Sequence, residues 1–276
     1  MECTVKNTKI NYEIYGDGVP ILMIHGWGVD HRLMKGCMEP IFQNTNLAWK
    51  RIYFDLPGMG KSKGVSWITG VDQMLELVLG FIDTVIPNGN FVLAGESYGG
   101  LLARAVINKR FSRVEGLLLI CPAAGRGAAD EKDAQFQVFE EDIPFLNSLA
   151  EEERNYFQTE GINVIRNKRV WNRYKEEVLP GQQIVDSTFL DNCTGKLSFD
   201  VDALDKPFTK PTLMLAGRQD SIVGYRGLWH IIEMYPRASF VLLDKAGHAL
   251  QIEQEVLFTE TVNEWLNRVE VDMVYR

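Results

Sequence analysis

Cysteine, histidine and long apolar runs are scarce in this sequence of 276 residues. It contains four cysteines and four histidines, without the spacing that is typical of a zinc site or a disulfide scaffold. No stretch reaches the roughly 18 uninterrupted apolar residues that suggest a membrane span. We therefore expect a soluble globular protein with reduced thiols, no metal and no membrane partner.

Positively charged residues are also fewer than negatively charged ones. The chain carries 29 lysines and arginines against 37 acidic residues, a net charge of −8, which argues against nucleic acid as a partner. The first residues, 1–6, lack the basic start and apolar middle of a signal peptide, so we expect a cytoplasmic location. No phosphate-binding glycine loop is present, and we expect no cofactor.

Short apolar runs alternate with helical patterns along most of the chain, which predicts an α/β fold with a mostly parallel central sheet and helices on both faces. An opening hairpin is expected from residues 4–6 and 10–15. The further strands are expected at residues 20–25, 51–55, 91–95, 114–121, 212–217 and 239–243. The clearest helical patterns cover residues 71–85, 101–109 and 254–268.

The long segment between the strands at 114–121 and 212–217 breaks this alternation. It holds about 90 residues, far more than an ordinary crossover, and it is charged, helical in pattern and rich in aromatic residues. We interpret residues 123–205 as an inserted helical cap on a core made of residues 1–122 and 206–276. Large cap aromatics are candidates for an apolar substrate pocket. Those singled out are Phe139, Phe145, Trp171 and Phe189.

The motif Gly-Glu-Ser-Tyr-Gly-Gly at 95–100 connects a buried strand to a helix and carries a serine at its apex. A turn this tight needs small residues beside the serine, because side chains at Gly95 or Gly99 would collide with neighbouring backbone. The turn presents the hydroxyl of Ser97 at a helix N-terminus, where free N–H groups can stabilise negative charge. The motif predicts a nucleophilic serine.

A serine nucleophile needs a base, and the base needs an orienting acceptor. His248 follows the strand at 239–243, and Asp220 follows the strand at 212–217. Both therefore belong on loops at the sheet edge that carries Ser97, where open α/β sheets place their sites. The order Ser97, Asp220, His248 predicts a catalytic triad.

The chain resembles the α/β-hydrolases that carry a helical cap. The resemblance covers nearly the whole chain outside the cap and rests on five motifs in the expected order. These are His-Gly-Trp-Gly at 25–28, Asp-Leu-Pro-Gly-Met-Gly-Lys-Ser at 55–62, the serine motif at 95–100, Gly-Arg-Gln-Asp at 217–220 and Gly-His at 247–248. It implies that Ser97 is the nucleophile, His248 the general base and Asp220 its orienting carboxylate. It also implies an oxyanion hole formed by the backbone N–H groups of Trp27 and Tyr98.

Other polar residues near these motifs are expected to be structural. His25 is expected to brace the oxyanion loop, and Asp55 to stabilise its turn. Glu96 is expected to be a satisfied carboxylate that could also tune the site. His31 and His230 lie in helical patterns, and we expect both to be partly exposed.

The function expected from these features is hydrolysis of small apolar carboxylic esters through an acyl-enzyme, with a pH midpoint near the roughly 6.5 of an ordinary histidine. Ser97 argues against dehalogenases and epoxide hydrolases of this fold, which use an aspartate there. Proline-type aminopeptidases and carbon–carbon bond hydrolases remain open, because they use the same triad. A small-molecule receptor with vestigial hydrolysis also remains open. The substrate and the oligomeric state are not predicted.

Overall fold

The computed structural model of the chain describes residues 1–123, 136–159 and 162–274. Within these ranges eight strands form one sheet in the order β1-β2-β4-β3-β5-β6-β9-β10. The strands, in sheet order, are β1 (Glu2–Val5), β2 (Thr8–Tyr15), β4 (Trp49–Phe54), β3 (Val19–Ile24), β5 (Phe91–Glu96), β6 (Val114–Ile120), β9 (Thr212–Gly217) and β10 (Ala238–Leu243). From β4 to β10 every neighbouring pair is parallel, while β2 runs antiparallel to both β1 and β4.

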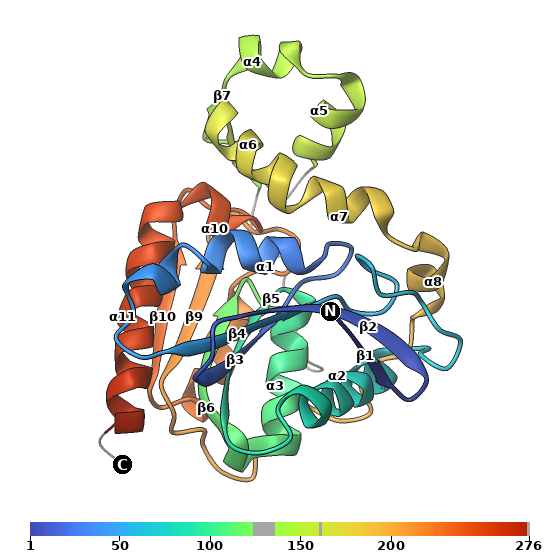
Figure 1. Cartoon of the computed structure of the whole chain (residues 1–276). Helices are drawn as coiled ribbons and strands as arrows, with labels where there is room; N and C mark the ends of the chain where they lie inside the picture. The colour runs from blue at the N-terminus through green and yellow to red at the C-terminus, as the bar shows by residue number, and fades with distance from the viewer. Residues whose placement is uncertain (124–135, 160–161, 275–276) are drawn as a thin grey trace.

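Helices cover both faces of this sheet (Figure 1). The core helices are α1 (His31–Met38), α2 (Val71–Val85), α3 (Tyr98–Arg110), α9 (Arg226–Ile231), α10 (Leu250–Glu253) and α11 (Glu255–Val274). The central strands are apolar on both sides, as expected of a parallel sheet that is buried on both faces. In β3, for example, Leu22 and Ile24 pack in the cluster with α2 and α3, whereas Ile21 and Met23 pack in the cluster with α1 and α11.

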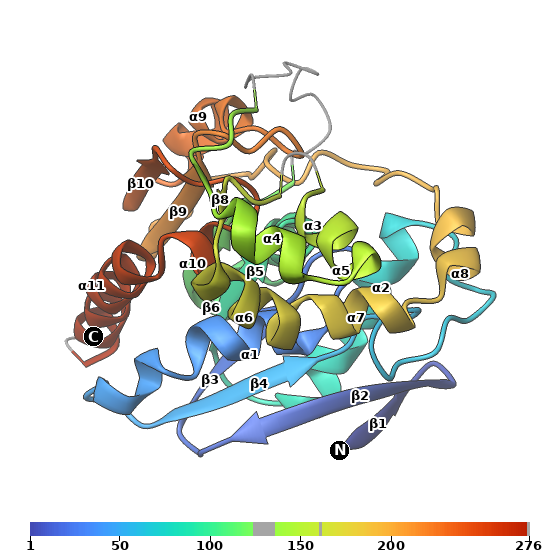
Figure 2. The same ribbon diagram turned by 90° about the horizontal axis from the view of Figure 1, so that it is seen from above.

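The described residues between β6 and β9 form mostly short helices. The elements there are β7 (Glu140–Glu141), α4 (Ile143–Ser148), α5 (Glu151–Phe157), β8 (Ile165–Arg166), α6 (Lys168–Glu177), α7 (Leu179–Ile184) and α8 (Ser187–Asn192). Helices α4 to α7 lie together on one side of the sheet, over α1 and α10 (Figures 1 and 2). They have a small apolar cluster of their own, in which Phe157, Trp171 and Tyr174 contact one another.

Two features of the first hairpin and the last helix differ from the sequence prediction. The strands expected at 4–6 and 10–15 left the turn between them, but β2 begins at Thr8 and the turn is at Lys6 and Asn7, with φ of 45° and 63°. Two successive positive φ values are typical of a type I′ turn, whose twist matches that of the flanking strands. The last helix continues past 268 to Val274, because Val269 is still buried against the sheet.

Candidate active site

Ser97 lies at a sharp turn between β5 and α3. Its backbone has φ 50° and ψ −117°, a conformation that costs a non-glycine residue free energy and is found mainly where function requires it. Two backbone hydrogen bonds hold the turn in place: the Ser97 N–H donates to the Ile120 carbonyl at 2.9 Å, and the Ala123 N–H donates to the Ser97 carbonyl at 2.9 Å. The hydroxyl is thereby presented at the N-terminus of α3.

The glycines beside Ser97 are required by close backbone contacts. A Cβ atom at Gly95 would lie 2.4 Å from the Gly99 carbonyl oxygen, and one at Gly99 would lie 2.1 Å from the Ile24 carbonyl oxygen. Neither neighbour is a flexible side chain that could move away. The turn therefore accepts only glycine at both positions, which agrees with the sequence-based argument.

His248 connects Ser97 to Asp220 through two hydrogen bonds. Its Nε2 lies 2.9 Å from the Ser97 Oγ, and its Nδ1 lies 2.8 Å from the Asp220 Oδ2. Each residue follows the C-terminal end of a parallel strand: Ser97 follows β5, Asp220 follows β9 and His248 follows β10. The structure thus brings together the three residues that the sequence selected.

The Asp220 carboxylate is fully buried and fixed on both oxygens. Its Oδ1 accepts hydrogen bonds from the N–H groups of Ile222, at 2.9 Å, and Val223, at 3.1 Å, which leaves Oδ2 to face His248. This arrangement makes Nδ1 of His248 the protonated nitrogen, so that Nε2 is free to accept the proton of Ser97.

The charges around His248 favour its protonated form. Burial opposes a positive charge on the ring, but the hydrogen-bonded Asp220, together with Glu96 and Glu253, outweighs burial and raises the pKa of His248 from 6.5 to about 9. The sequence-based expectation of an ordinary histidine pKa did not include the two glutamates, which the fold brings to His248 from separate elements.

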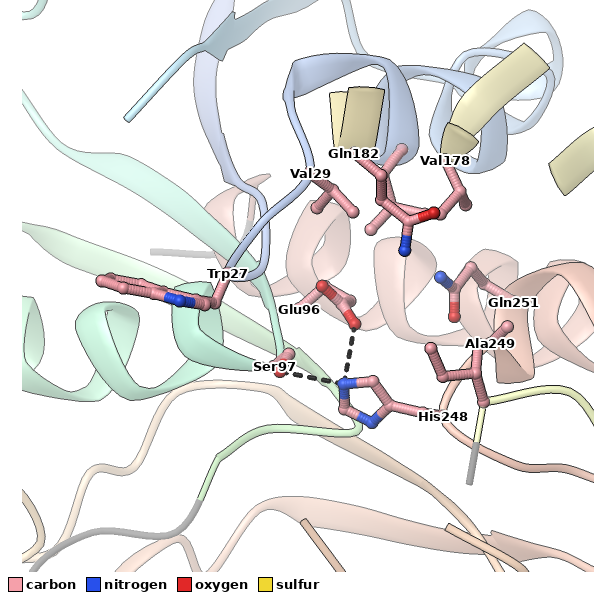
Figure 3. A pocket seen from close by; sticks show the side chains of 11 residues that line it. Trp27, Val29, Glu96, Ser97, Val178, Gln182, His248, Ala249 and Gln251 are labelled. Atoms are coloured by element: carbon pink, nitrogen blue, oxygen red, sulfur yellow. Dashed lines mark hydrogen bonds and ion pairs between the residues drawn. The ribbon is translucent and has the colours of Figure 1, made fainter. Parts of the chain in front are cut away.

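Glu96 is a buried carboxylate directly beside Ser97. Its Oε1 lies 3.5 Å from His248 Nε2, and Figure 3 shows it pointing into the same space as Ser97. Burial raises the pKa of Glu96 from 4.5 to about 7, an effect that the nearby His248 partly offsets. A Cβ at Gly26 would lie 2.2 Å from Glu96 Oε2, so a larger residue there would displace the carboxylate from its present position.

We expect Glu96→Gln to move the acidic limb of the pH profile of kcat/KM to lower pH, by about one unit. The substitution keeps the shape of the side chain but removes a negative charge that raises the pKa of His248. Rates measured across the acidic and alkaline limbs test this, with Glu152→Gln on the exposed surface of α5 as control. A profile that does not move would contradict a role for Glu96 in the electrostatics of His248.

Glu253 is a functional neighbour that the sequence analysis missed. Its Oε2 accepts from the Gly247 N–H at 2.7 Å, next to His248, and its Oε1 accepts from the Val164 N–H and from the Ile165 N–H, the latter at 2.9 Å. One buried side chain therefore links the histidine loop to β8. The only sequence signal for this link is that Glu253 follows the Gly-His motif by a few residues. A glutamate in a helix at such a position is too common to be informative.

The two expected oxyanion residues lie on either side of the serine turn. Tyr98 is the first residue of α3, where N–H groups have no acceptor within the helix, and Trp27 lies in the loop between β3 and α1. Their rings meet edge to face, with centroids 4.9 Å apart. Trp27 is 39% exposed, and its side chain points away from His248 (Figure 3).

A pocket with a volume of about 80 Å³ opens beside Ser97. Its apolar lining includes Val29 and Leu33 from the core and Val178 from the end of α6. Its polar lining includes Glu96 and two glutamines, Gln182 of α7 and Gln251 of α10 (Figure 3). The pocket is small and most of its surface is apolar, with several polar side chains among the lining residues.

The four cap aromatics proposed as pocket residues are not among the described residues that line this pocket. Trp171 is stacked with Tyr174 inside the cluster of the short helices, and Phe145 packs against the same cluster. Phe189 lies against Gly58 and Gly64, where a Cβ would meet its ring at 2.1 and 2.5 Å. Phe139 is 36% exposed. Trp171 and Phe145 thus belong to the small core of the short helices, and none of the four lines the pocket beside Ser97.

Two of the remaining histidines are structural. His25 accepts a hydrogen bond on Nε2 from the Leu56 N–H at 3.0 Å, so it braces the loop as predicted. His31 was expected to be partly exposed but is 6% exposed, because its Nδ1 is hydrogen-bonded to the buried Asp55 at 2.7 Å. Asp55 also accepts from the Lys61 N–H, which makes it the centre of its turn.

Two groups of potential metal ligands lie close together in the described part of the chain. One combines Cys121 with Asp220 and His248, and the other combines Asp30 with His31 and Asp55. Burial raises the pKa of the Cys121 thiol well above its ordinary value, which disfavours the thiolate that a metal would need. The second group is occupied by its own hydrogen bonds, including the cap of α1 by Asp30. Neither group indicates a metal site.

None of the helices in the described ranges is both long enough and apolar enough to cross a membrane. A family model described as "alpha/beta hydrolase fold" matches residues 19–255. A pimeloyl-[acyl-carrier protein] methyl ester esterase of Legionella pneumophila (strain Paris) is 26% identical, over 94% of this chain and 99% of its own.

Solved structures agree with this match. An alpha/beta superfamily hydrolase from Oenococcus oeni PSU-1 superposes with a TM-score of 0.82 at 29% identity, covering 98% of this chain and 99% of its own. A proline iminopeptidase-related protein from Thermus thermophilus has a TM-score of 0.72 at 20% identity, covering 99% of this chain and 98% of its own, a likeness of fold alone. The family match, the sheet order and the esterase relative agree with the expected fold: this chain belongs to the alpha/beta hydrolase fold family.

Proposed function

We propose that this protein is a serine hydrolase that cleaves small carboxylic esters through an acyl-enzyme. The observation that carries the proposal is the unbroken hydrogen-bonded chain from Asp220 through His248 to Ser97, with the nucleophile in a strained turn at a helix N-terminus. The esterase relative, at 26% identity over nearly its whole length, supports an ester rather than another acyl substrate.

In the first half of the reaction, the Ser97 Oγ attacks the ester carbonyl while His248 Nε2 takes its proton. The carbonyl oxygen becomes negatively charged, and the N–H groups of Trp27 and Tyr98 stabilise it by hydrogen bonds. Asp220 stabilises the imidazolium that has formed. His248 then gives its proton to the alkoxide, which leaves as the alcohol, and the acyl group stays on Ser97.

In the second half, water replaces the alcohol. His248 removes a proton from the water as its oxygen attacks the acyl carbonyl, and the same N–H groups hold the second oxyanion. The intermediate collapses, the bond to Ser97 breaks, and His248 returns the proton to the Ser97 oxygen. The products are the free acid and the unchanged enzyme.

We further propose that residues 123–205 act as a cap that limits the size of the substrate. Two observations support this role: α7 contributes Gln182 to the pocket beside Ser97, and Glu253 ties β8 to the loop of His248. A pocket of about 80 Å³ favours short groups over long lipid chains.

The direct test is turnover of p-nitrophenyl esters from acetate to palmitate, run beside proline and leucine anilides. We expect turnover of the short esters and labelling of Ser97 by a fluorophosphonate. Faster cleavage of the anilides would favour the aminopeptidase alternative. Labelling without turnover of any member of the panel would favour a carbon–carbon bond hydrolase or a small-molecule receptor.

The pH dependence of the reaction provides a separate prediction. Only neutral His248 can act as the base, and the carboxylates around it raise its pKa from 6.5 to about 9. We therefore expect kcat/KM to fall as the pH is lowered below about 9, and to be about tenfold below its alkaline plateau at about pH 8. A profile that is flat from about pH 6 to about pH 10 would contradict a histidine base.

A further inference from the structure

The pocket beside Ser97 has a polar end that the proposed triad does not use. It is formed by three side chains, Gln182, Gln251 and Glu96, which come from α7, α10 and the end of β5. In Figure 3, Gln182 and Gln251 converge on the space next to Glu96 and Ser97. A pocket that only had to hold an alkyl group would not need three polar side chains, because burying polar groups without partners costs free energy.

Gln182 is oriented as a hydrogen-bond donor. Its Oε1 accepts a hydrogen bond from the hydroxyl of Tyr174 at 2.7 Å, and Tyr174 is itself buried in the cluster of the short helices. Since the oxygen of the carboxamide is held in this way, its Nε2 faces the pocket (Figure 3). A ligand group near Gln182 must therefore be able to accept a hydrogen bond.

Gln251 carries an unsatisfied acceptor, and because Figure 3 shows its Nε2 toward Gln182, a half-turn of the carboxamide brings Oε1 to the pocket. The residue is 1% exposed, and its buried Oε1 has no hydrogen-bond partner among the described residues. Its main chain is fixed, because the Gln251 carbonyl accepts from Arg173 at 3.1 Å. An unsatisfied buried carbonyl costs about 1–3 kcal/mol, so a donor on a bound ligand would gain from pairing with it.

The charges and the volume restrict what can bind there. Glu96, Asp220 and Glu253 place three carboxylates around His248, which disfavours an anionic ligand group. A cationic group would oppose the imidazolium that forms on His248 during the proposed reaction. The volume of about 80 Å³ favours a compact group over a bulky one.

We propose that Gln182, Gln251 and Glu96 bind a hydroxyl group carried by a short ester substrate. The hydroxyl oxygen accepts from Gln182 Nε2, while its proton is donated to Gln251 Oε1 or to Glu96. The preferred substrates are then hydroxylated short esters rather than plain alkyl esters. This inference rests on the proposed ester hydrolysis and deepens it by naming the substrate class.

The test compares kcat/KM for methyl butyrate with two hydroxylated esters, methyl 3-hydroxybutyrate and 2-hydroxyethyl butyrate, each corrected for its rate of alkaline hydrolysis. These two place the hydroxyl on the acyl and on the alcohol side, and the better one identifies the side that enters the pocket. We expect at least one of them to exceed methyl butyrate by about tenfold, since a site built to bond a hydroxyl rejects its alkyl analogue. Monomethyl succinate and methyl 3-aminopropanoate carry charged groups. We expect their kcat/KM to be lower than that of either hydroxylated ester.

The variants Gln182→Met and Gln251→Met nearly preserve side-chain volume and remove the hydrogen bonds. In each variant we expect the ratio of hydroxylated to plain ester to fall to about twofold or less. Gln73→Met on α2, which lies outside this pocket, is the control and is expected to keep the wild-type ratio.

The proposal is overturned if the wild-type protein does not prefer a hydroxylated ester, if it prefers a charged one, or if the preference survives in either methionine variant. If no ester is hydrolysed, the proposed ester hydrolysis fails, and calorimetry decides the binding question separately. Tighter binding of 3-hydroxybutyramide than of butyramide, lost in Gln251→Met, would still support the hydroxyl site. Equal binding of the two amides would contradict it.

Discussion

Ser97→Ala is expected to lower kcat for short esters by on the order of 10⁴-fold or more while the protein stays folded. The substitution removes the atom that attacks the carbonyl, which is also the hydroxyl oxygen that is hydrogen-bonded to His248 Nε2. Burst kinetics and steady-state turnover with p-nitrophenyl butyrate measure the loss. Labelling by a fluorophosphonate should disappear in the same variant.

The matched control is Ser112→Ala, because Ser112 is exposed and lies far along the chain from the turn. It should keep wild-type turnover and labelling. Turnover within about threefold of wild type in purified Ser97→Ala would eliminate the acyl-enzyme mechanism. An adduct located by mass spectrometry on another residue would count equally against it.

The conformation of Ser97 adds a second readout to this experiment. Its φ of 50° costs a residue with a Cβ on the order of 1–3 kcal/mol, and alanine bears the same strain as serine. Ser97→Gly relieves that strain but loosens the unfolded chain, so the two effects oppose each other. We expect Ser97→Gly to be as inactive as Ser97→Ala and no less stable in thermal unfolding.

The parallel sheet could be predicted from the sequence because its strands are apolar on both faces. Runs such as the one in β6 are buried over their whole length, and such runs are readily recognised. The short pair β7 and β8 could not be predicted, because two residues are too few for any periodicity. The segment was therefore interpreted as helical only.

The triad could be predicted for a related reason. Ser97, Asp220 and His248 each follow a strand that the sequence locates, and parallel strands end at the same edge. The pocket could not be predicted from the sequence, because its lining depends on how α7 and α10 lie against β5. Gln182 and Gln251 carry no motif, whereas Trp171 and Phe189 are conspicuous in the sequence but are used in packing.

The same limit explains why the pKa expected for His248 from the sequence was too low. A motif identifies the base and its acid partner, but the total charge around the ring depends on residues from elements far apart in sequence. Glu96 and Glu253 come from β5 and α10, and both approach the ring only in the folded chain. Electrostatics at a buried site is therefore a tertiary property.

Asp220→Asn is expected to lower kcat by on the order of 10⁴-fold, the second large effect. In the native protein, Oδ1 of Asp220 accepts from the Ile222 and Val223 N–H groups. In the variant the amide oxygen must take that place, which turns the new NH₂ group toward Nδ1 of His248. Nδ1 then has to accept, the ring proton moves to Nε2, and His248 can no longer take the proton of Ser97.

The loss of charge acts in the same direction. An amide does not stabilise the imidazolium that forms during acylation, so the pKa of His248 should also fall in the variant. Binding should change little, because Asp220 lies behind His248 and is fully buried. We therefore expect the effect to fall on kcat more than on KM in a stopped-flow measurement of acylation.

Asp205→Asn in an exposed turn is the matched control and should behave as wild type. The two other carboxylates near His248 provide the sharper comparison. If Asp220→Asn were nearly silent while Glu96→Gln or Glu253→Gln abolished turnover, the orienting acid would have been assigned wrongly. The hydrogen bond of 2.8 Å from His248 Nδ1 to Asp220 argues for the opposite result, since Glu96 approaches only Nε2, at 3.5 Å, and Glu253 is engaged by backbone N–H groups.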